Sequence, residues 1–199
     1  MAQSHRETIA MKAMISPEPA LLGFLRASPL HGYDLHKQVV TQLGPVWHLG
    51  MSQMYAILKE YEARGWIETL VTPQNGRPPR KMLQLTPAGR RAFDTWMAQS
   101  ARGLREFRVD FFARLYFARE AGRPALREFL DHQLDETRRE RLALQNTKTS
   151  SEYAALVREF RLAQLETILQ WLDQYRSETK IAPTVSKQRR KTSKKGKAK

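Results

Sequence analysis

Residues 20–93 contain the patterns that decide the fold. They read ALLGFLRASPLHGYDLHKQV over 20–39, SQMYAILKEYEARGWIETL over 52–70 and QNGRPPRKMLQLTPAGRRAF over 74–93. In the first two stretches apolar residues recur at helical spacing, and in the third a turn sequence separates two short apolar runs. This order predicts three helices, a two-stranded hairpin and a fourth helix.

The third expected helix, Ser52 to Ala63, has two different faces when its residues are placed about 100° apart. The core stripe consists of Met54, Ile57, Leu58 and Tyr61. The opposite face carries Ser52, Ala56 and Lys59, with Tyr55 beside them. Tyr55 either packs on a neighbouring loop or, with Lys59, reaches bases and phosphates in a major groove. We favour the groove, because the small Ala56 lets such a helix approach closely.

The hairpin is expected to expose a cluster of cations. Gly65 ends the third helix, residues 66–71 and 82–85 are the expected strands, and residues 73–76 form the turn. Around two prolines after that turn come three cations: Arg77, Arg80 and Lys81. These cations are either simply solvated or part of a wing that straddles a phosphate backbone. Their position directly after the outward-facing helix favours the wing.

A helix-turn-helix followed by a cationic hairpin is the pattern of a winged helix-turn-helix domain. Three motifs follow one another: Ser28-Pro29-Leu30-His31-Gly32-Tyr33; then Tyr55, Leu58, Tyr61 and Gly65; then Gly76 to Lys81 with Leu85-Thr86 and Gly89. Over roughly residues 18–93 these motifs resemble those of the PadR family of bacterial transcription regulators. The resemblance implies a DNA-binding regulator, most often a repressor, that acts on a palindromic operator in double-stranded DNA.

The expected DNA contacts come from the third helix, the start of the second helix and the wing. They are Ser52, Gln53, Tyr55, Ala56, Lys59, His31, Tyr33, Arg77, Arg80 and Lys81. Hydroxyl and amide groups can read base edges, and the cations can bind phosphates. His31 has a second interpretation, as the cap of the second helix.

Residues 98–180 show helical periodicity alone, with a break at Gly122-Arg123-Pro124. The last segment, Glu152 to Arg176, has an apolar stripe that includes the expected dimer contacts: Phe160, Ile168, Trp171, Leu172 and Tyr175. Such a stripe needs a partner within the chain or across a dimer. A PadR branch with a larger helical C-terminal domain is similar, and the resemblance implies a homodimer formed through these helices.

Trp96 and Trp171 are the candidate residues of an effector pocket. Some PadR proteins hold flat aromatic effectors between their domains, so the resemblance implies a pocket for a small aromatic molecule. The alternative is that both indoles belong to the core or to the dimer interface. Helical spacing favours this alternative, because apolar stripes are usually core.

The 199-residue chain carries a net charge of +14, which indicates an anionic partner. Residues 187–199 contain eight Lys or Arg and no acid, so we expect a disordered basic tail over 181–199. The tail either keeps the protein in solution or grips phosphates non-specifically. We expect a DNA-binding domain over 1–97, with a flexible arm over 1–15, and a helical dimerisation domain over 98–180. The expected fold class is mainly α with a small two-stranded β wing.

Other classes of protein lack support in this sequence. There is no cysteine, no secretory signal and no stretch long and apolar enough to cross a bilayer, so we expect a cytoplasmic protein without a membrane partner. There is no glycine-rich phosphate loop, nucleophile elbow or His-Glu-x-x-His, so we expect no catalysis, metal or cofactor. The main interpretation is a homodimeric repressor released by a small molecule or stress signal. Its alternatives are an activator and a winged-helix protein-interaction module.

Overall fold

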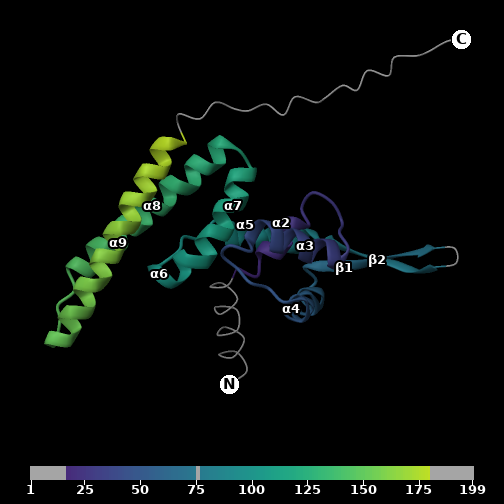
Figure 1. Cartoon of the computed structure of the whole chain (residues 1–199), viewed down its shortest axis with the longest axis horizontal. Coiled ribbons are helices and arrows are strands. Elements are labelled where there is room, and N and C mark those ends of the chain that lie inside the picture. Colours follow the sequence, from purple (N-terminus) through teal and green to yellow (C-terminus); the bar gives the residue numbers. More distant parts are fainter. Residues whose placement is uncertain (1–16, 75–76, 180–199) are drawn as a thin grey trace, which may run out of the picture.

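The computed structural model describes residues 17–74 and 77–179, with side chains described everywhere except at 72–80. The expectations for the N-terminal arm and the basic tail therefore lie outside the described residues. The molecule is elongated (Figure 1): a hairpin of β1 (Ile67–Gln74) and β2 (Arg77–Leu85) projects at one end, and the helices α8 (Arg123–Gln145) and α9 (Glu152–Glu178) lie at the other. The predicted fold class, mainly α with a two-stranded wing, is confirmed.

From residue 17 on, the N-terminal part of the described chain is built by three helices: α2 (Ala20–Phe24), α3 (Gly32–Leu43) and α4 (Met51–Ala63). The predicted core stripe of α4 is confirmed, because Met54, Ile57, Leu58 and Tyr61 are all buried. These side chains pack in one cluster with buried residues of α2 and α3: Leu21, Leu22, Leu35, Val39 and Leu43. The hydrophobic pattern at helical spacing therefore defines the inner faces of these helices.

The strands of the wing are longer than predicted. They pair antiparallel from Ile67 opposite Leu85 outward, with an irregularity between Thr72 and Gln74. The two prolines of the cationic segment were expected in a tip outside the strands, and this was wrong, because residues 77–80 belong to β2. Prolines lack the N–H that a regular ladder needs, and here they lie opposite the irregular step, where a bulge tolerates them.

Thr86 joins the wing to the next helix, α5 (Pro87–Met97). Its hydroxyl oxygen accepts a hydrogen bond from the Gly89 N–H at 3.1 Å, and its hydroxyl group lies 2.7 Å from the Gly65 carbonyl. Gly89 approaches Trp66, the residue before β1, so closely that a Cβ atom there would lie 2.0 Å from the Trp66 carbonyl oxygen. In the Leu-Thr-x-x-Gly motif, the threonine therefore caps α5, and the glycine allows α5 to pack closely against the chain at Trp66.

The chain then continues through α6 (Gly103–Glu106), the π-helix η1 (Phe107–Phe111) and α7 (Phe112–Glu120). Phe117 of α7 packs against Phe24, Phe93 and Trp96, with ring centroids 5.2, 5.1 and 6.3 Å apart. Gly23 of α2 makes room for this ring, because a Cβ at that position would lie 2.5 Å from it. A helix beyond the expected boundary at residue 97 thus completes the N-terminal core.

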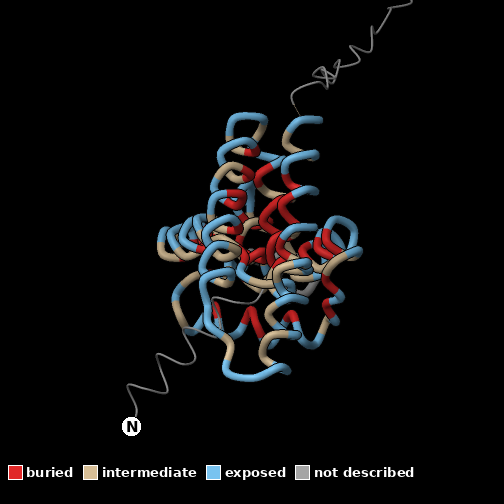
Figure 2. Tube along the Cα trace, turned by 90° about the vertical axis from the view of Figure 1, so that its left-hand side faces the viewer, coloured by how far each residue is buried: buried red, intermediate tan, exposed pale blue. Residues whose placement is uncertain are grey.

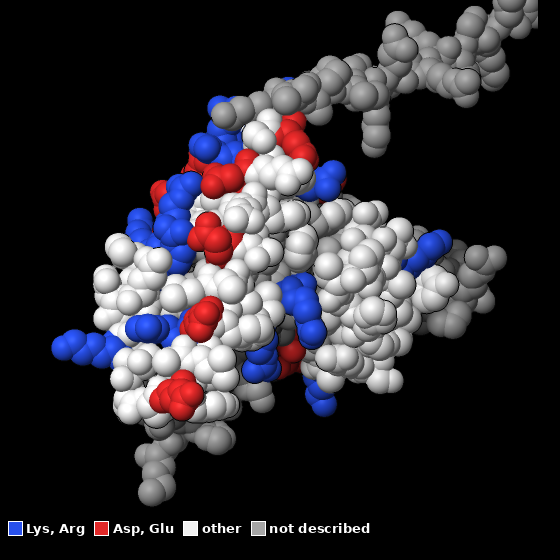
Figure 3. Space-filling view, turned by 60° about the vertical axis from the view of Figure 1, so that its left-hand side comes forward, with Lys and Arg blue, Asp and Glu red and all other residues white. Residues whose placement is uncertain are grey.

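The helices α8 and α9 pair as a long hairpin. Their buried side chains face one another and η1, whereas the outer faces are exposed (Figure 2). At the surface, Arg138 is paired with Asp173 at 3.3 Å and Arg141 with Glu166 at 2.6 Å. Figure 3 shows cationic and anionic side chains interspersed on this end of the molecule. Exposed pairs contribute little individually, so apolar contacts hold the hairpin.

Two of the expected dimer contacts are already covered within the chain. Leu172 is 0 % and Ile168 7 % exposed, and both pack against residues of α8 and η1. Assigning these two residues to a dimer interface was therefore wrong, because they have almost no surface left for a second copy. Phe160, by contrast, is 63 % exposed. None of the described helices combines the length and apolar character of a bilayer span.

Replacing Gly89 with Ala is expected to destabilise the fold. The added methyl group would press on a backbone carbonyl, which cannot swing away as a side chain can, so we expect a loss of about 1–3 kcal/mol or more in unfolding free energy. Urea denaturation followed by circular dichroism measures this change. Gly50→Ala is the matched control, because a Cβ at Gly50 meets nothing within 4 Å. Equal stability of the two variants would contradict the close crossing.

Candidate nucleic-acid interface

The outer face of α4 is available to a partner. Ser52, Gln53, Tyr55, Ala56 and Lys59 are all exposed, and Tyr55 retains 51 % of its surface. This helix lies beside the wing, away from α8 and α9 (Figure 1). It therefore presents two hydroxyl groups, an amide, a small residue and a cation together on one surface.

Tyr55 is also held by a neighbour. A Cβ atom at Gly32 would lie 2.4 Å from the Tyr55 hydroxyl oxygen and 2.9 Å from the ring carbon that bears it. The phenol thus packs over the first turn of α3, and half of its surface stays open. The two sequence-based interpretations of Tyr55 are therefore compatible, because its tip contacts a neighbouring element while the ring remains accessible. Sequence reasoning identified Gly32 only as part of a motif and missed this contact.

His31 and Tyr33 flank that glycine. His31 occupies the N-cap position of α3, but its side chain makes no capping hydrogen bond. Its backbone carbonyl instead accepts the Leu35 N–H at 2.9 Å. His31 is therefore the N-cap residue of this helix, as its second interpretation expected, and it caps through its backbone carbonyl. Tyr33 is 67 % exposed and points away from the core. Tyr33, at the start of α3, and Tyr55, which packs over Gly32, are thus both exposed aromatic residues.

The turn between α3 and α4 is held by a hydrogen bond from His36, a contact that sequence reasoning did not predict. His36 lies 2.8 Å from the Leu49 carbonyl through Nε2, so that nitrogen carries the proton and donates. Within the same turn, Trp47 is buried, and its backbone N–H donates a hydrogen bond to the Leu43 carbonyl at 2.7 Å. These bonds orient the start of α4. The only sign of this contact in the sequence was a histidine on α3 followed by a turn that contains a tryptophan.

The base of the wing is joined to the start of α3. Leu30 exchanges two backbone hydrogen bonds with Leu83 of β2, at 3.1 and 2.8 Å. Lys81, opposite Val71 in the ladder, is exposed. Arg77 and Arg80 belong to β2, but their side chains lie outside the described residues. The exposed face of α4, the start of α3 and the wing therefore form one connected surface.

The two tryptophans proposed for an effector pocket do not enclose one. Trp96 is 2 % exposed and is surrounded by Phe93, Phe117 and Asp110, so its ring has no free face for a ligand. Trp171 belongs to a different cluster, in which it stacks on Tyr175 at 5.2 Å. The pocket between these two indoles is therefore wrong, and the alternative of core packing holds for Trp96.

Comparison with known proteins agrees with this geometry. A model of the transcriptional regulator PadR-like family matches residues 21–95. The negative transcriptional regulator PadR of Bacillus subtilis is 31 % identical over 98 residues, 49 % of this chain and 54 % of the relative. A probable transcriptional regulator of Mycobacterium tuberculosis, Rv1176c, is 28 % identical over 80 residues, 40 % of this chain and 42 % of the relative.

The chain thus spans about half the length of the curated relatives it matches. A crystal structure of Bacillus subtilis PadR in complex with operator DNA covers 81 % of this chain and 98 % of its own, at 25 % identity and a TM-score of 0.42. The match to the model of the PadR-like family of transcriptional regulators over residues 21–95 covers the surface formed by α3, α4 and the wing.

Proposed function

We propose that this protein is a sequence-specific, DNA-binding transcriptional regulator without catalytic activity, and that it acts as a homodimeric repressor. The observation that carries the proposal is the exposed face of α4, with Tyr55, Ala56 and Lys59 beside the wing of a PadR-like domain. Repression is the simplest mode because the relative from Bacillus subtilis is named a negative regulator.

In this proposal α4 enters the major groove. Ala56 allows a close approach, while Ser52, Gln53 and Tyr55 face the base edges and Lys59 faces a phosphate. The wing cations Arg77, Arg80 and Lys81 straddle the adjacent backbone, where they contribute affinity without reading sequence. His31 and Tyr33 lie at the start of α3 and complete the contact near the backbone.

The proposed homodimer uses the outer face of α9. Tyr153, Leu156 and Phe160 are 75, 62 and 63 % exposed, and Val157 lies between them at 39 %. An apolar ridge of this kind on a long helix is typical of an interface rather than of a solvated surface. Two copies related by a twofold axis would present two winged helices to a palindromic operator. Release of the operator by a small aromatic molecule or a stress signal remains part of the proposal.

The alternatives predict different behaviour. A protein-interaction module with the same fold would bind duplex DNA weakly, and an activator would bind the operator while raising transcription. Affinity that falls steeply with salt, together with preference for a selected sequence, supports the regulator and argues against the interaction module. A reporter gene under the selected operator separates repression from activation.

Tyr55→Ala and Lys59→Ala are each expected to weaken binding to a duplex selected from a random-sequence pool. A lost base or phosphate contact costs about 1–3 kcal/mol, and both residues lie outside the core stripe, so folding should be retained. Fluorescence anisotropy measures the affinity. Lys148→Ala is the control, because Lys148 is an exposed cation between α8 and α9, far from the wing. Unchanged affinity in both α4 variants would remove this helix from the reading surface.

Gly32→Ala is expected to weaken specific binding with little change in stability. The new methyl group would meet the end of the Tyr55 side chain, which can swing away and which supplies the three nearest atoms. The phenol would then leave its position, and the affinity should fall to that of Tyr55→Ala. The double variant should be no weaker than either single variant. Additive losses in this cycle would show that Gly32 acts independently of Tyr55.

Leu156→Asp combined with Phe160→Asp is expected to give a folded monomer. Both side chains are exposed within the chain, so the carboxylates remain hydrated in the monomer but would be buried without partners in the dimer. Leu172→Asp should instead unfold the helical hairpin, because Leu172 is 0 % exposed. Light scattering and circular dichroism separate these results. A stable dimer of the Leu156/Phe160 variant would locate the interface elsewhere.

A further inference from the structure

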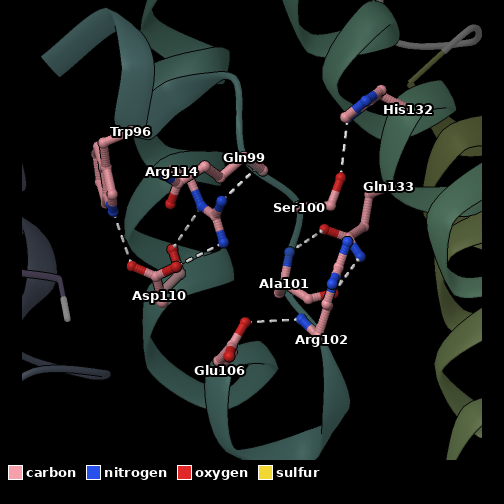
Figure 4. Close-up of polar contacts among 10 residues, drawn as sticks. All are labelled: Trp96, Gln99, Ser100, Ala101, Arg102, Glu106, Asp110, Arg114, His132 and Gln133. Atoms are coloured by element: carbon pink, nitrogen blue, oxygen red, sulfur yellow. Dashed lines mark hydrogen bonds and ion pairs between the residues drawn. The ribbon is translucent and has the colours of Figure 1, made fainter. Parts of the chain in front are cut away.

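The segment that connects the winged domain to the C-terminal helices is held by hydrogen bonds from neighbouring side chains. It runs from Ala98 to Arg102, between α5 and α6. At each residue from Gln99 to Gly103, a side chain of α6, α7 or α8 bonds the backbone or the side chain. Figure 4 shows these bonds for Gln99, Ser100, Ala101 and Arg102.

Gln133 of α8 bonds both backbone groups of a single connector residue, Ala101. It is 1 % exposed, its Oε1 accepts the Ala101 N–H at 2.9 Å, and its Nε2 donates to the Ala101 carbonyl at 2.9 Å. Its Nε2 also donates to the Thr137 hydroxyl at 3.1 Å. A single buried amide thus saturates both backbone groups of one connector residue. Because unpaired polar groups are costly in such a place, the two elements are fixed in one register.

Arg114 of α7 holds the residue closer to the winged domain. Its side chain is 1 % exposed, one guanidinium nitrogen donates to the Gln99 carbonyl, and another lies 2.5 Å from Asp110. Asp110 also accepts the Trp96 indole N–H at 2.9 Å. Burial raises the pKa of Asp110, while Arg114 and the indole act in the opposite direction. The last turn of α5, the connector and α7 are thereby joined in one polar cluster.

The outer bonds complete the attachment. The Ser100 hydroxyl lies 2.9 Å from Nδ1 of His132, Glu106 accepts the Arg102 N–H at 2.8 Å, and Glu140 accepts the Gly103 N–H at 3.2 Å. Gly103 has a φ of +65°, which other residues adopt only with strain. Connectors between domains are usually exposed and free to bend. Here, four of the five connector residues, Gln99 to Arg102, are bonded by side chains of α6, α7 and α8, and so is the following Gly103.

We propose that Gln133 is a positioning residue that makes the connector rigid and thereby sets the separation of the two winged helices in the dimer. The inference rests on the proposed function only for its consequence on DNA. A rigid connector permits one distance between recognition helices, so it selects one spacing of operator half-sites. Gln133 touches no DNA in this proposal and acts through the backbone of Ala101.

The rigidity is measurable within a single chain. The protein has no cysteine, so Glu68→Cys on β1 and Gln145→Cys at the end of α8 give two unique spin-label sites, both exposed. Dilution with excess unlabelled protein leaves only the distance within one chain. Electron–electron double resonance should give a narrow distribution for the otherwise native protein. Gln133→Met, which keeps the volume but removes both Ala101 bonds, should broaden it.

Thr137→Val is the matched control. It removes a buried hydroxyl group on the same helix but leaves both bonds between Gln133 and Ala101, so the distribution should stay narrow despite a loss of stability. If Gln133→Met does not fold, Gly103→Ala serves instead, because its Cβ meets nothing within 4 Å and only the φ of the connector is disfavoured. An unchanged width in the folded connector variant, or equal broadening in Thr137→Val, would overturn the proposal.

The DNA consequence uses the selected duplex with one base pair inserted between its half-sites. The native protein should lose about tenfold or more in affinity on insertion, whereas Gln133→Met should bind both duplexes nearly alike. Binding to a single half-site should be the same for both proteins. Equal discrimination by Gln133→Met would overturn the role in spacing. If no duplex is selected at all, the proposed function fails, while the distance measurement still decides whether the connector is rigid.

Discussion

Phe117 lies in a gap that Gly23 leaves open on α2, and its ring contacts Phe24, Phe93 and Trp96. Through this contact α7, which precedes the long helical hairpin, supplies part of the core of the winged domain. The two halves of the chain therefore share apolar surface as well as a connector. A winged domain cut after α5 would expose those rings to water, which costs roughly 1.5–3 kcal/mol for each large side chain left uncovered.

Glycines also permit close packing around the candidate interface. Gly32 accommodates the Tyr55 phenol, and Gly89 accommodates the Trp66 carbonyl, so α4 and the wing each have a defined position relative to their neighbours. His36 and the Leu30–Leu83 bonds orient the intervening segments. The proposed reading surface is thus supported by close contacts at its edges, while its centre, formed by Ala56 and Lys59, stays open. Such support favours recognition, because little conformational freedom is lost on binding.

The polar cluster around the connector connects this interface with the rest of the molecule. Arg114 and Gln133 are buried polar residues, and each makes hydrogen bonds to the connector that an apolar residue in its place could not make. Apolar packing at Phe117 holds the two halves together but tolerates small shifts, whereas paired hydrogen bonds to one backbone residue permit a single register. Cohesion and orientation are therefore supplied by different interactions. Together they make the proposed dimer face of α9 and the proposed DNA face of α4 parts of one body.

The order of elements and the faces of α4 were predictable from sequence, because helical periodicity states which side chains share a side. The motifs around Gly32, the wing and Gly89 were likewise sufficient to indicate the family. Periodicity does not state what covers a face: Ile168 and Leu172 share a stripe with Phe160, yet α8 covers the first two and leaves the third exposed. Nor does it state that Gln133 bonds a backbone 32 residues earlier in the chain. Local preferences are properties of a short segment, whereas burial and long-range hydrogen bonds depend on which segments meet, and only the tertiary structure decides that.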